Sequence, residues 1–305
     1  MERKSPFSKT DILLLLMVSI WGFNFSVLKI VLRQFLPMSF NIIRFISASA
    51  LVLFFLFLRE KKIWVEKSDW GRILLLGIFG HTCYQLLFIY GINKTTASNA
   101  SLIMASVPIL IGIMSSLSGY EKVRPFAWVG IFLSFFGIFL IIRADVNGFN
   151  FTSAHFKGNI LILLSAISWA IYTVVAKPML KKYSPLKLTA VSMAIGTLLL
   201  IPFSLNELKK QDWQSISFPA WMGLIYSSIL AIALGYTLWY IGVEKVGTTR
   251  TAIYSNLTPV LAAFFAWQIL AELITIYHLI GAAVIFTGIY LTRFNAGKKR
   301  MKELK

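Results

Sequence analysis

Long apolar stretches separated by short charged segments constrain the fold of this chain more than any other feature of its sequence. Ten segments are almost free of Asp, Glu, Lys and Arg: those around residues 12–28, 45–58, 73–89, 100–117, 126–142, 158–176, 188–205, 219–243, 251–271 and 279–292. Each is near the roughly 20 residues that an α-helix needs to cross a hydrocarbon core about 30 Å thick, and several are at the short end of that range. Charged residues make up 14% of the chain, whereas a soluble domain carries roughly 25%. The sequence therefore predicts an all-α integral membrane protein with ten transmembrane helices.

The basic residues predict how these helices are oriented. With the N-terminus in the cytoplasm, the cytoplasmic segments hold 22 Lys and Arg, the opposite segments hold 7, and Arg44 inside a span completes the total of 30. Such a bias is typical of membrane proteins, whose cytoplasmic loops are rich in positive charge. We therefore expect a multi-pass protein of the cell (inner) membrane that contacts the lipid bilayer and has both termini in the cytoplasm.

Several other classes of protein fit the sequence poorly. The net charge is +18, but the basic residues are spread over loop ends without a nucleic-acid-binding motif, so no nucleic-acid partner is expected. Cys83 is the only cysteine, which excludes internal disulfides and cysteine-based zinc sites. No P-loop, His-Glu-x-x-His or Gly-x-Ser-x-Gly motif occurs, so we expect neither an enzyme nor a bound metal or cofactor. The oligomeric state stays open between monomer and homodimer.

The two halves of the chain repeat each other at fixed spacings. The offset is 148 residues for one block and 151 for the next: the pairs are Trp21/Trp169, Lys29/Lys177 and Pro37/Pro185, then Lys94/Lys245, Pro108/Pro259, Glu121/Glu272, Gly130/Gly281 and Gly137/Gly288. Because each half holds five spans, an odd number, the second half crosses the membrane in the opposite sense. The sequence predicts two inverted five-helix repeats, residues 1–147 and residues 148–305 with the basic tail, and a solute site between them near the midplane.

These motifs, taken in order, resemble the EamA-type ten-helix carriers of the drug/metabolite transporter superfamily. The resemblance covers nearly the whole chain and rests on Trp21-Gly22-Phe23-Asn24-Phe25, Arg44-Phe45, residues 96–101 before Pro108, Tyr120-Glu121 and the second copy of this pattern. It implies a secondary carrier for amino acids or related metabolites with a central cavity between the halves. Two departures stand out: Ser192 takes the place of Arg44 in the second copy, and Ala271-Glu272 replaces the expected Gly-Glu.

Arg44 is the first candidate for binding a solute. It is the only basic residue well inside a predicted span, and a charge at that depth is costly unless it serves a function. A guanidinium that faces the cavity could hold a carboxylate or phosphate by paired hydrogen bonds. Alternatively, Arg44 reaches the outer surface or binds backbone carbonyls of a neighbouring helix. Asn41, one turn earlier, belongs to the same polar stripe and is a second candidate.

Other polar and aromatic residues also share helix faces near mid-span. His81, Tyr84 and Gln85 have i, i+3 and i+4 spacing, which predicts one face that lines a wet cavity or bonds to other helices. Trp21 with Asn24 and Trp169 with Tyr172 occupy matching positions of the two repeats, so we expect them on opposite sides of one cavity, unless they only pack helices together. Asn256 is a further candidate: it either faces the solute or binds the backbone carbonyl that Pro259 leaves without a donor. Pro108 and Pro259 are expected to mark kinks or gates.

We therefore expect a secondary-active or facilitative carrier of a small-molecule solute, first of all an amino acid or related compound, working by export or exchange through alternating access. All 12 acidic residues lie at span ends or in loops, which disfavours a carboxylate-based proton relay and leaves His81 as the remaining proton carrier. Carriers of S-adenosylmethionine, nucleotide-type solutes or organic phosphates are the alternative. A non-transporting receptor or structural membrane protein is the competing class.

Overall fold

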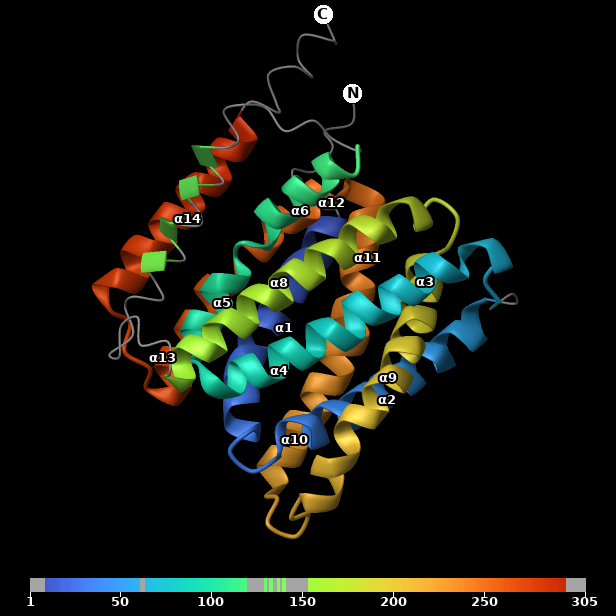
Figure 1. Cartoon of the computed structure of the whole chain (residues 1–305), viewed down its shortest axis with the longest axis horizontal. Coiled ribbons are helices and arrows are strands. Elements are labelled where there is room, and N and C mark those ends of the chain that lie inside the picture. Colours follow the sequence, from blue (N-terminus) through green and yellow to red (C-terminus); the bar gives the residue numbers. More distant parts are fainter. Residues whose placement is uncertain are drawn as a thin grey trace, which may run out of the picture.

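The computed structural model describes residues 9–60, 64–119, 129–130, 132–133, 136–137, 139–140 and 153–294. These residues form helices joined by short turns, and they include no strand (Figure 1). The α-helices are α1 (Lys9–Val31), α2 (Pro37–Arg59), α3 (Trp70–Leu76), α4 (Tyr84–Lys94), α5 (Ala97–Met104), α6 (Val107–Leu117), α8 (Ala154–Met179), α9 (Pro185–Lys210), α10 (Phe218–Tyr226), α11 (Gly235–Val246), α12 (Thr248–Ser255), α13 (Thr258–Leu270) and α14 (Ile276–Phe294). Three further segments, η1 (Lys67–Asp69), η2 (Gly77–Cys83) and η3 (Ser227–Leu234), are non-α helices.

The helices have the length and composition of membrane spans. Within the described residues, seven continuous helical segments are long and apolar enough to cross a membrane: Lys9–Val31, Pro37–Arg59, Lys67–Lys94, Ala97–Leu117, Ala154–Met179, Pro185–Lys210 and Phe218–Val246. Two shorter apolar helices follow, Thr258–Leu270 and Ile276–Thr287. The prediction of an all-helical, multi-pass membrane protein is therefore confirmed. Most of the predicted span 126–142 and the predicted repeat boundary at 147/148 lie outside the described residues.

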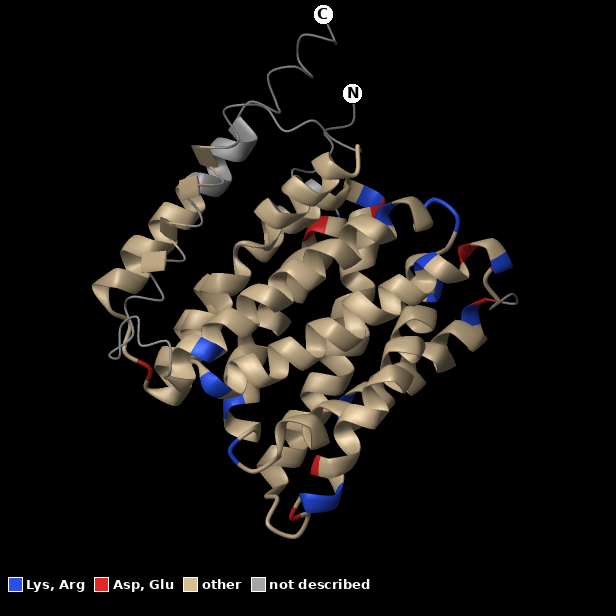
Figure 2. Ribbon diagram, in the orientation of Figure 1, with Lys and Arg blue, Asp and Glu red and all other residues tan. Residues whose placement is uncertain are grey.

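The charges lie where a membrane protein can keep them in contact with water. In Figure 2 the Lys, Arg, Asp and Glu residues gather at the ends of helices, and the middles of the helices are almost free of them. Large apolar side chains such as Phe54, Phe57 and Phe132 are exposed on the outside of the bundle. An apolar outer surface of this kind is favourable in contact with lipid and unfavourable in contact with water.

Helices α2 and α9 lie side by side, and side chains connect them at both ends. The first backbone N–H groups of α2 have no intrahelical acceptor, and two side chains from the end of α9 accept from them: Gln211 Oε1 from Leu36 at 2.6 Å and Glu207 Oε2 from Met38 at 2.6 Å. At the opposite end, Glu60 accepts from the hydroxyl of Ser184 and pairs with Lys187 at 3.0 Å. The C-terminal end of α9 therefore caps the N-terminal end of α2, whereas the C-terminal end of α2 binds side chains at the start of α9, whose own N-cap is Ser184.

The remaining helices pack around this pair in matching combinations. Helix α2 packs against η3, and α9 packs against η2. Helix α1 contacts α11 and α13, and α8 contacts α4 and α6. Each of these contacts made by α1 or α2 thus has a counterpart made by α8 or α9.

Two long helical segments contain π-helical turns. These turns form η2 and η3, at similar places in Lys67–Lys94 and Phe218–Val246. In a π-turn the backbone hydrogen bonds join residues i and i+5, which interrupts the regular i to i+4 hydrogen bonds of the α-helix. Backbone carbonyls in both turns are bound by side chains from the other half: Trp21 Nε1 donates to Ala231 O at 2.8 Å, and the Ser168 hydroxyl donates to Phe79 O at 2.9 Å.

Two other helical segments each contain a short non-helical break next to a proline. Helix α5 ends at Met104 and α6 begins at Val107; α12 ends at Ser255 and α13 begins at Thr258. The two interruptions are 151 residues apart at both edges. Pro108 and Pro259 each lie in the first turn of the helix that follows, where the missing N–H of proline costs nothing. The predicted kinks at the two prolines therefore correspond to breaks in the helices, and their role as gates stays a prediction.

Candidate functional site

A cavity, which we call the central cavity, lies where both helix breaks and the turn η3 meet α1, α2, α4, α8 and α11. About 80 Å³ of it is open to water-sized molecules, which is space for roughly five to eight waters. Seven of the predicted site residues line it: Trp21, Asn24, Arg44, Tyr84, Gln85, Trp169 and Pro259. An occupant larger than a few waters therefore needs the walls to move.

Arg44 is fully enclosed by the protein. Its side chain is 1% exposed, so it does not reach either surface of the bundle. Nη1 donates to the Ser227 hydroxyl at 2.9 Å, and Nη2 donates to Asn41 Oδ1 and Gln85 Oε1, each at 2.7 Å. These acceptors are side chains, so the alternative in which Arg44 binds backbone carbonyls does not hold in this structure. Asn41 itself does not line the cavity and instead orients the guanidinium.

No acidic residue compensates this charge in the described part of the chain. The acceptors around Arg44 are two amides and a hydroxyl, and its Nε is buried without a hydrogen-bond partner. The guanidinium also lies over the rings of Phe40 and Phe45, at 5.1 and 5.8 Å from the centroids. These contacts soften the cost of burying the cation, but they do not neutralise it. The central cavity thus has a positively charged wall.

Gln85 links Arg44 to a residue that the sequence analysis did not select. While its Oε1 accepts from Arg44, its Nε2 donates to the hydroxyl of Tyr236 at 2.7 Å. The network itself determines this orientation of the amide, because only Oε1 can accept from the guanidinium. The arrangement holds α2, α4 and α11 together at the wall of the cavity.

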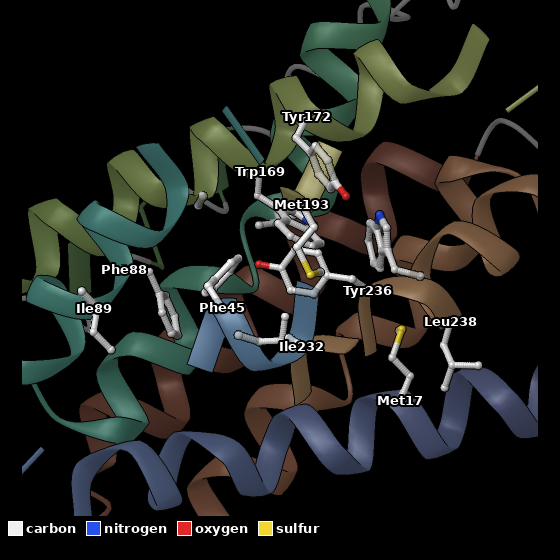
Figure 3. Packing of buried hydrophobic residues seen from close by; sticks show 14 of the residues in the cluster. Met17, Phe45, Phe88, Ile89, Trp169, Tyr172, Met193, Ile232, Tyr236 and Leu238 are labelled. Atoms are coloured by element: carbon white, nitrogen blue, oxygen red, sulfur yellow. The ribbon is translucent and has the colours of Figure 1, made fainter. Parts of the chain in front are cut away.

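Aromatic rings form much of the rest of the wall. The indoles of Trp21, Trp169 and Trp239 contact one another with centroid distances of 5.8, 5.8 and 5.5 Å. Tyr236 packs edge-on against Trp169 at 4.9 Å. The ring of Tyr236 also contacts Phe45 of α2 and Tyr172 of α8, which lie outside the lining of the cavity (Figure 3). Trp21 and Trp169 were expected on opposite sides of the cavity, but they touch, so they form one aromatic wall.

His81 and Tyr172 lie behind this wall and do not line the cavity. His81 stacks on Tyr236 at 5.3 Å, and Tyr172 stacks on Tyr240 at 5.2 Å. The predicted common face of His81, Tyr84 and Gln85 assumes regular α-helical turns. His81 belongs to the π-turn η2, whereas Tyr84 and Gln85 begin α4. The wider turn directs His81 to α9 and leaves the other two residues at the cavity.

His81 is bound to α9 through a hydroxyl group. Its Nε2 lies 3.0 Å from the hydroxyl of Ser192, which also donates to the carbonyl of Leu188 at 2.7 Å. The other ring nitrogen, Nδ1, is buried without a partner in the described chain.

The two other predicted residues outside the cavity are Asn256 and Pro108. Asn256 lies at the break between α12 and α13, where its Oδ1 is buried without a partner. Pro108 is buried in the first turn of α6. Both are next to lining residues, because Ser255, Thr258 and Val107 belong to the wall.

Sequence reasoning missed Tyr236 and Trp239, although a signal for both was present. They stand 151 positions after Gln85 and Phe88, and all four line the cavity. Applying the offset of the second block to residues of different type would have selected them. A search for potential metal ligands among the described residues finds no group of three or more His, Cys, Asp or Glu side chains.

Comparisons with known proteins agree with this architecture. The model of the EamA-like transporter family matches the chain twice, over residues 8–143 and 156–294. An uncharacterized transporter of Archaeoglobus fulgidus is 32% identical, with 93% of this chain and 97% of the relative covered. A chloroplastic WAT1-related protein of Arabidopsis thaliana is 28% identical, over 91% of this chain and 67% of that protein. One solved crystal structure has the same fold, with a TM-score of 0.69 at 17% identity and coverage of 93% and 96%.

Proposed function

The chain belongs to the EamA-like transporter family, and from this premise we propose that it carries a small metabolite, first of all an amino acid or related compound, by alternating access at the central cavity. Export and solute exchange are the modes that we propose. The carrier would act in the cell (inner) membrane, with ten spans and both termini in the cytoplasm, in line with the distribution of basic residues.

The observation that carries the proposal is the buried cation in the wall of the cavity. Arg44 has neutral partners and no acidic partner in the described chain. Burying a charge without a counter-charge is costly, and a carboxylate from the solute would supply the counter-charge by charge-assisted hydrogen bonds. A static structural protein would gain nothing from such a group.

Several features support two inverted repeats as the machinery. The two family matches begin 148 residues apart, at 8 and 156, and end 151 residues apart, at 143 and 294, which are the offsets of the repeated motifs. The contacts between the two halves come in matched pairs, such as α2 with η3 and α9 with η2. Discontinuous helices of both halves line the cavity, as in carriers whose repeats rock around a central site.

Organic phosphates and nucleotide-type solutes are the second candidate, because a guanidinium binds phosphate and carboxylate alike. S-adenosylmethionine fits less well than either. Its sulfonium would enter a cavity that already contains the charge of Arg44.

Uptake into proteoliposomes tests the proposal. Radiolabelled amino acids, carboxylates and nucleotide-type metabolites are offered to vesicles with and without preloaded counter-solute. We expect saturable uptake of at least one solute, stimulated by preloading. Arg44→Gln should lower this uptake more than tenfold, because truncating one partner of a buried charge pair costs about 2–5 kcal/mol.

Arg59→Gln is the matched control, since Arg59 is an exposed residue at the end of the same helix. Its uptake should equal that of the wild type, and thermal unfolding should show that both variants are folded. Absence of uptake for the whole panel by folded, inserted protein would instead favour a receptor or structural role.

A further inference from the structure

Some residues that line the central cavity carry buried polar atoms without a hydrogen-bond partner, and these atoms indicate which chemical groups a bound solute should have. Four residues that line the cavity are more than nine-tenths buried, and each carries a polar atom without a hydrogen-bond partner in the described chain. These atoms are Arg44 Nε, Trp239 Nε1, Thr258 Oγ1 and Asn24 Oδ1. A buried polar group without a partner destabilises the structure, so an occupant that pairs with these atoms is favoured.

Donors predominate in this set. The N–H groups of Arg44 and Trp239 can only donate, and the Thr258 hydroxyl can do either. The Tyr236 hydroxyl accepts from Gln85, which leaves its own hydrogen to donate. Asn24 Oδ1 is the one unpaired atom of the four that can only accept. The cavity therefore suits a solute that brings acceptors rather than donors.

The positive charge of the wall also favours a solute that carries acceptors and a negative charge. Arg44 is the only charged residue among the described residues that line the cavity. A second cation bound next to the guanidinium would be repelled more strongly in this buried site than in water, because the effective dielectric constant is lower. An ammonium group on the solute would meet this repulsion without an Asp or Glu of the wall to offset it.

Aromatic faces are the remaining place where an ammonium could bind. Here the rings cover one another: Trp21 packs at right angles to Trp169, and Trp169 packs at right angles to Tyr236. The indole N–H of Trp21 is already bound to Ala231 O. The wall thus offers an apolar surface for the body of a solute, and the rings of Trp21, Trp169 and Tyr236 are already packed against one another.

We propose that the occupant is an organic carboxylate without an ammonium group, such as a deaminated relative of an amino acid, held by Arg44 with Trp239 as a second donor. The inference rests on the proposed carrier function and narrows its solute class. Solutes of this kind bring the negative charge and the acceptors that the wall lacks. An amino acid of the same shape would add a positive charge and three N–H donors.

Two series of solutes with constant shape test the proposal. The first consists of 3-phenylpropionate, phenylalanine and phenethylamine; the second consists of 4-methylpentanoate, leucine and 3-methylbutylamine. Binding to the purified protein is measured by the change in tryptophan fluorescence, and transport is measured by counterflow in proteoliposomes. In at least one series we expect the carboxylate to bind about tenfold more tightly than the amino acid, which is the effect of one charged hydrogen bond, and the amine not to bind.

Variants identify the groups responsible. Arg44→Gln should abolish the preference for the carboxylate. Trp239→Phe, which removes the N–H and keeps a ring, should weaken carboxylate binding about tenfold. Trp64→Phe is the matched control, because Trp64 is 76% exposed, and it should bind like the wild type.

The possible outcomes separate this inference from the carrier function. Tighter binding of the amino acid or the amine, or no binding of either carboxylate, would overturn the inference even if transport of another solute established the carrier. Carboxylate binding without counterflow would overturn the carrier function and leave the solute chemistry in place.

Discussion

Gln85 and Tyr236, which stand 151 positions apart in the chain, are hydrogen-bonded to each other at the wall of the central cavity, with Gln85 Nε2 and the Tyr236 hydroxyl 2.7 Å apart. In the proposed repeat these positions are equivalent. Equivalent residues can touch only close to the axis that relates the two halves. The contact therefore supports a two-fold axis that passes beside Arg44, which Gln85 also binds.

Loss of the Tyr236 hydroxyl should destabilise the protein. Tyr236→Phe leaves the Gln85 amide without its acceptor in a buried site, which costs about 1–3 kcal/mol. We expect a lower thermal unfolding temperature in detergent. Tyr277→Phe is the control, because the Tyr277 side chain is exposed on α14. Equal unfolding temperatures for wild type and Tyr236→Phe would mean that the hydrogen bond contributes nothing.

Gly80 should not tolerate a methyl group. A Cβ at this position would lie 2.1 Å from the ring of Tyr172, and overpacking of this kind typically costs about 1–3 kcal/mol. Gly80→Ala should therefore lower the unfolding temperature. Gly71→Ala in α3 is the matched control: no atom lies within 4 Å of its added methyl group, so it should raise stability by up to about 1 kcal/mol. A neutral Gly80→Ala would show that Tyr172 moves aside easily.

Ala271→Gly should stabilise the protein. Ala271 ends α13 with φ 52° and ψ 32°, a left-handed conformation that costs a residue with a Cβ roughly 1–2 kcal/mol. Glycine adopts it without strain, so a gain of about 1 kcal/mol is expected, reduced by the larger entropy of glycine in the unfolded chain. Gly247, with φ 86°, is the converse test, because Gly247→Ala should lose stability. A fall in unfolding temperature for Ala271→Gly would contradict the argument.

The contacts of Lys182 should stabilise the protein in a salt-dependent way. Its ammonium lies 2.6 Å from carboxylate oxygens of both Asp69 and Glu66, and hydrogen bonds to these groups raise its pKa above the usual value. A raised pKa means that the stabilisation is complete below the ordinary pKa of lysine and disappears only as the pH rises through the raised one.

Lys182→Met should therefore lower the unfolding temperature by the same amount throughout about pH 6 to 9, well below the ordinary lysine pKa. The deficit should shrink at high salt, which screens exposed charges. Lys181→Met, at the exposed neighbouring position, should show no such deficit. A deficit that varies across this pH range would point to another titrating group.

The fold class could be predicted from the sequence because in lipid the backbone N–H and C=O groups must bond to each other, which an apolar helix achieves within itself. Segments such as residues 12–28 and 188–205 carry no charge over the length of a span, and within lipid such segments form helices that satisfy their own backbone groups. The π-turns η2 and η3 could not be predicted in this way. Their bond pattern depends on partners far away in the sequence, such as Trp21 for Ala231 and Ser168 for Phe79.

Only some residues of the cavity wall could be predicted from the sequence. Arg44 and Trp21 could be selected because a charge or a paired Trp at mid-span is rare in an apolar sequence. Whether these residues bind a solute stays a prediction. His81 could not be placed without the register of η2, and the contact between Trp21 and Trp169 depends on how the two halves pack.

The capping of α2 by the end of α9 has a consequence for biosynthesis. When the ribosome releases residues 37–59 into the membrane, Glu207 and Gln211, which accept from the first N–H groups of α2, have not yet been translated. The hydrogen bonds that complete the start of α2 can therefore form only after residues 207–211 have been synthesised. In a chain that ends before residue 207, the first N–H groups of α2 would lack these acceptors.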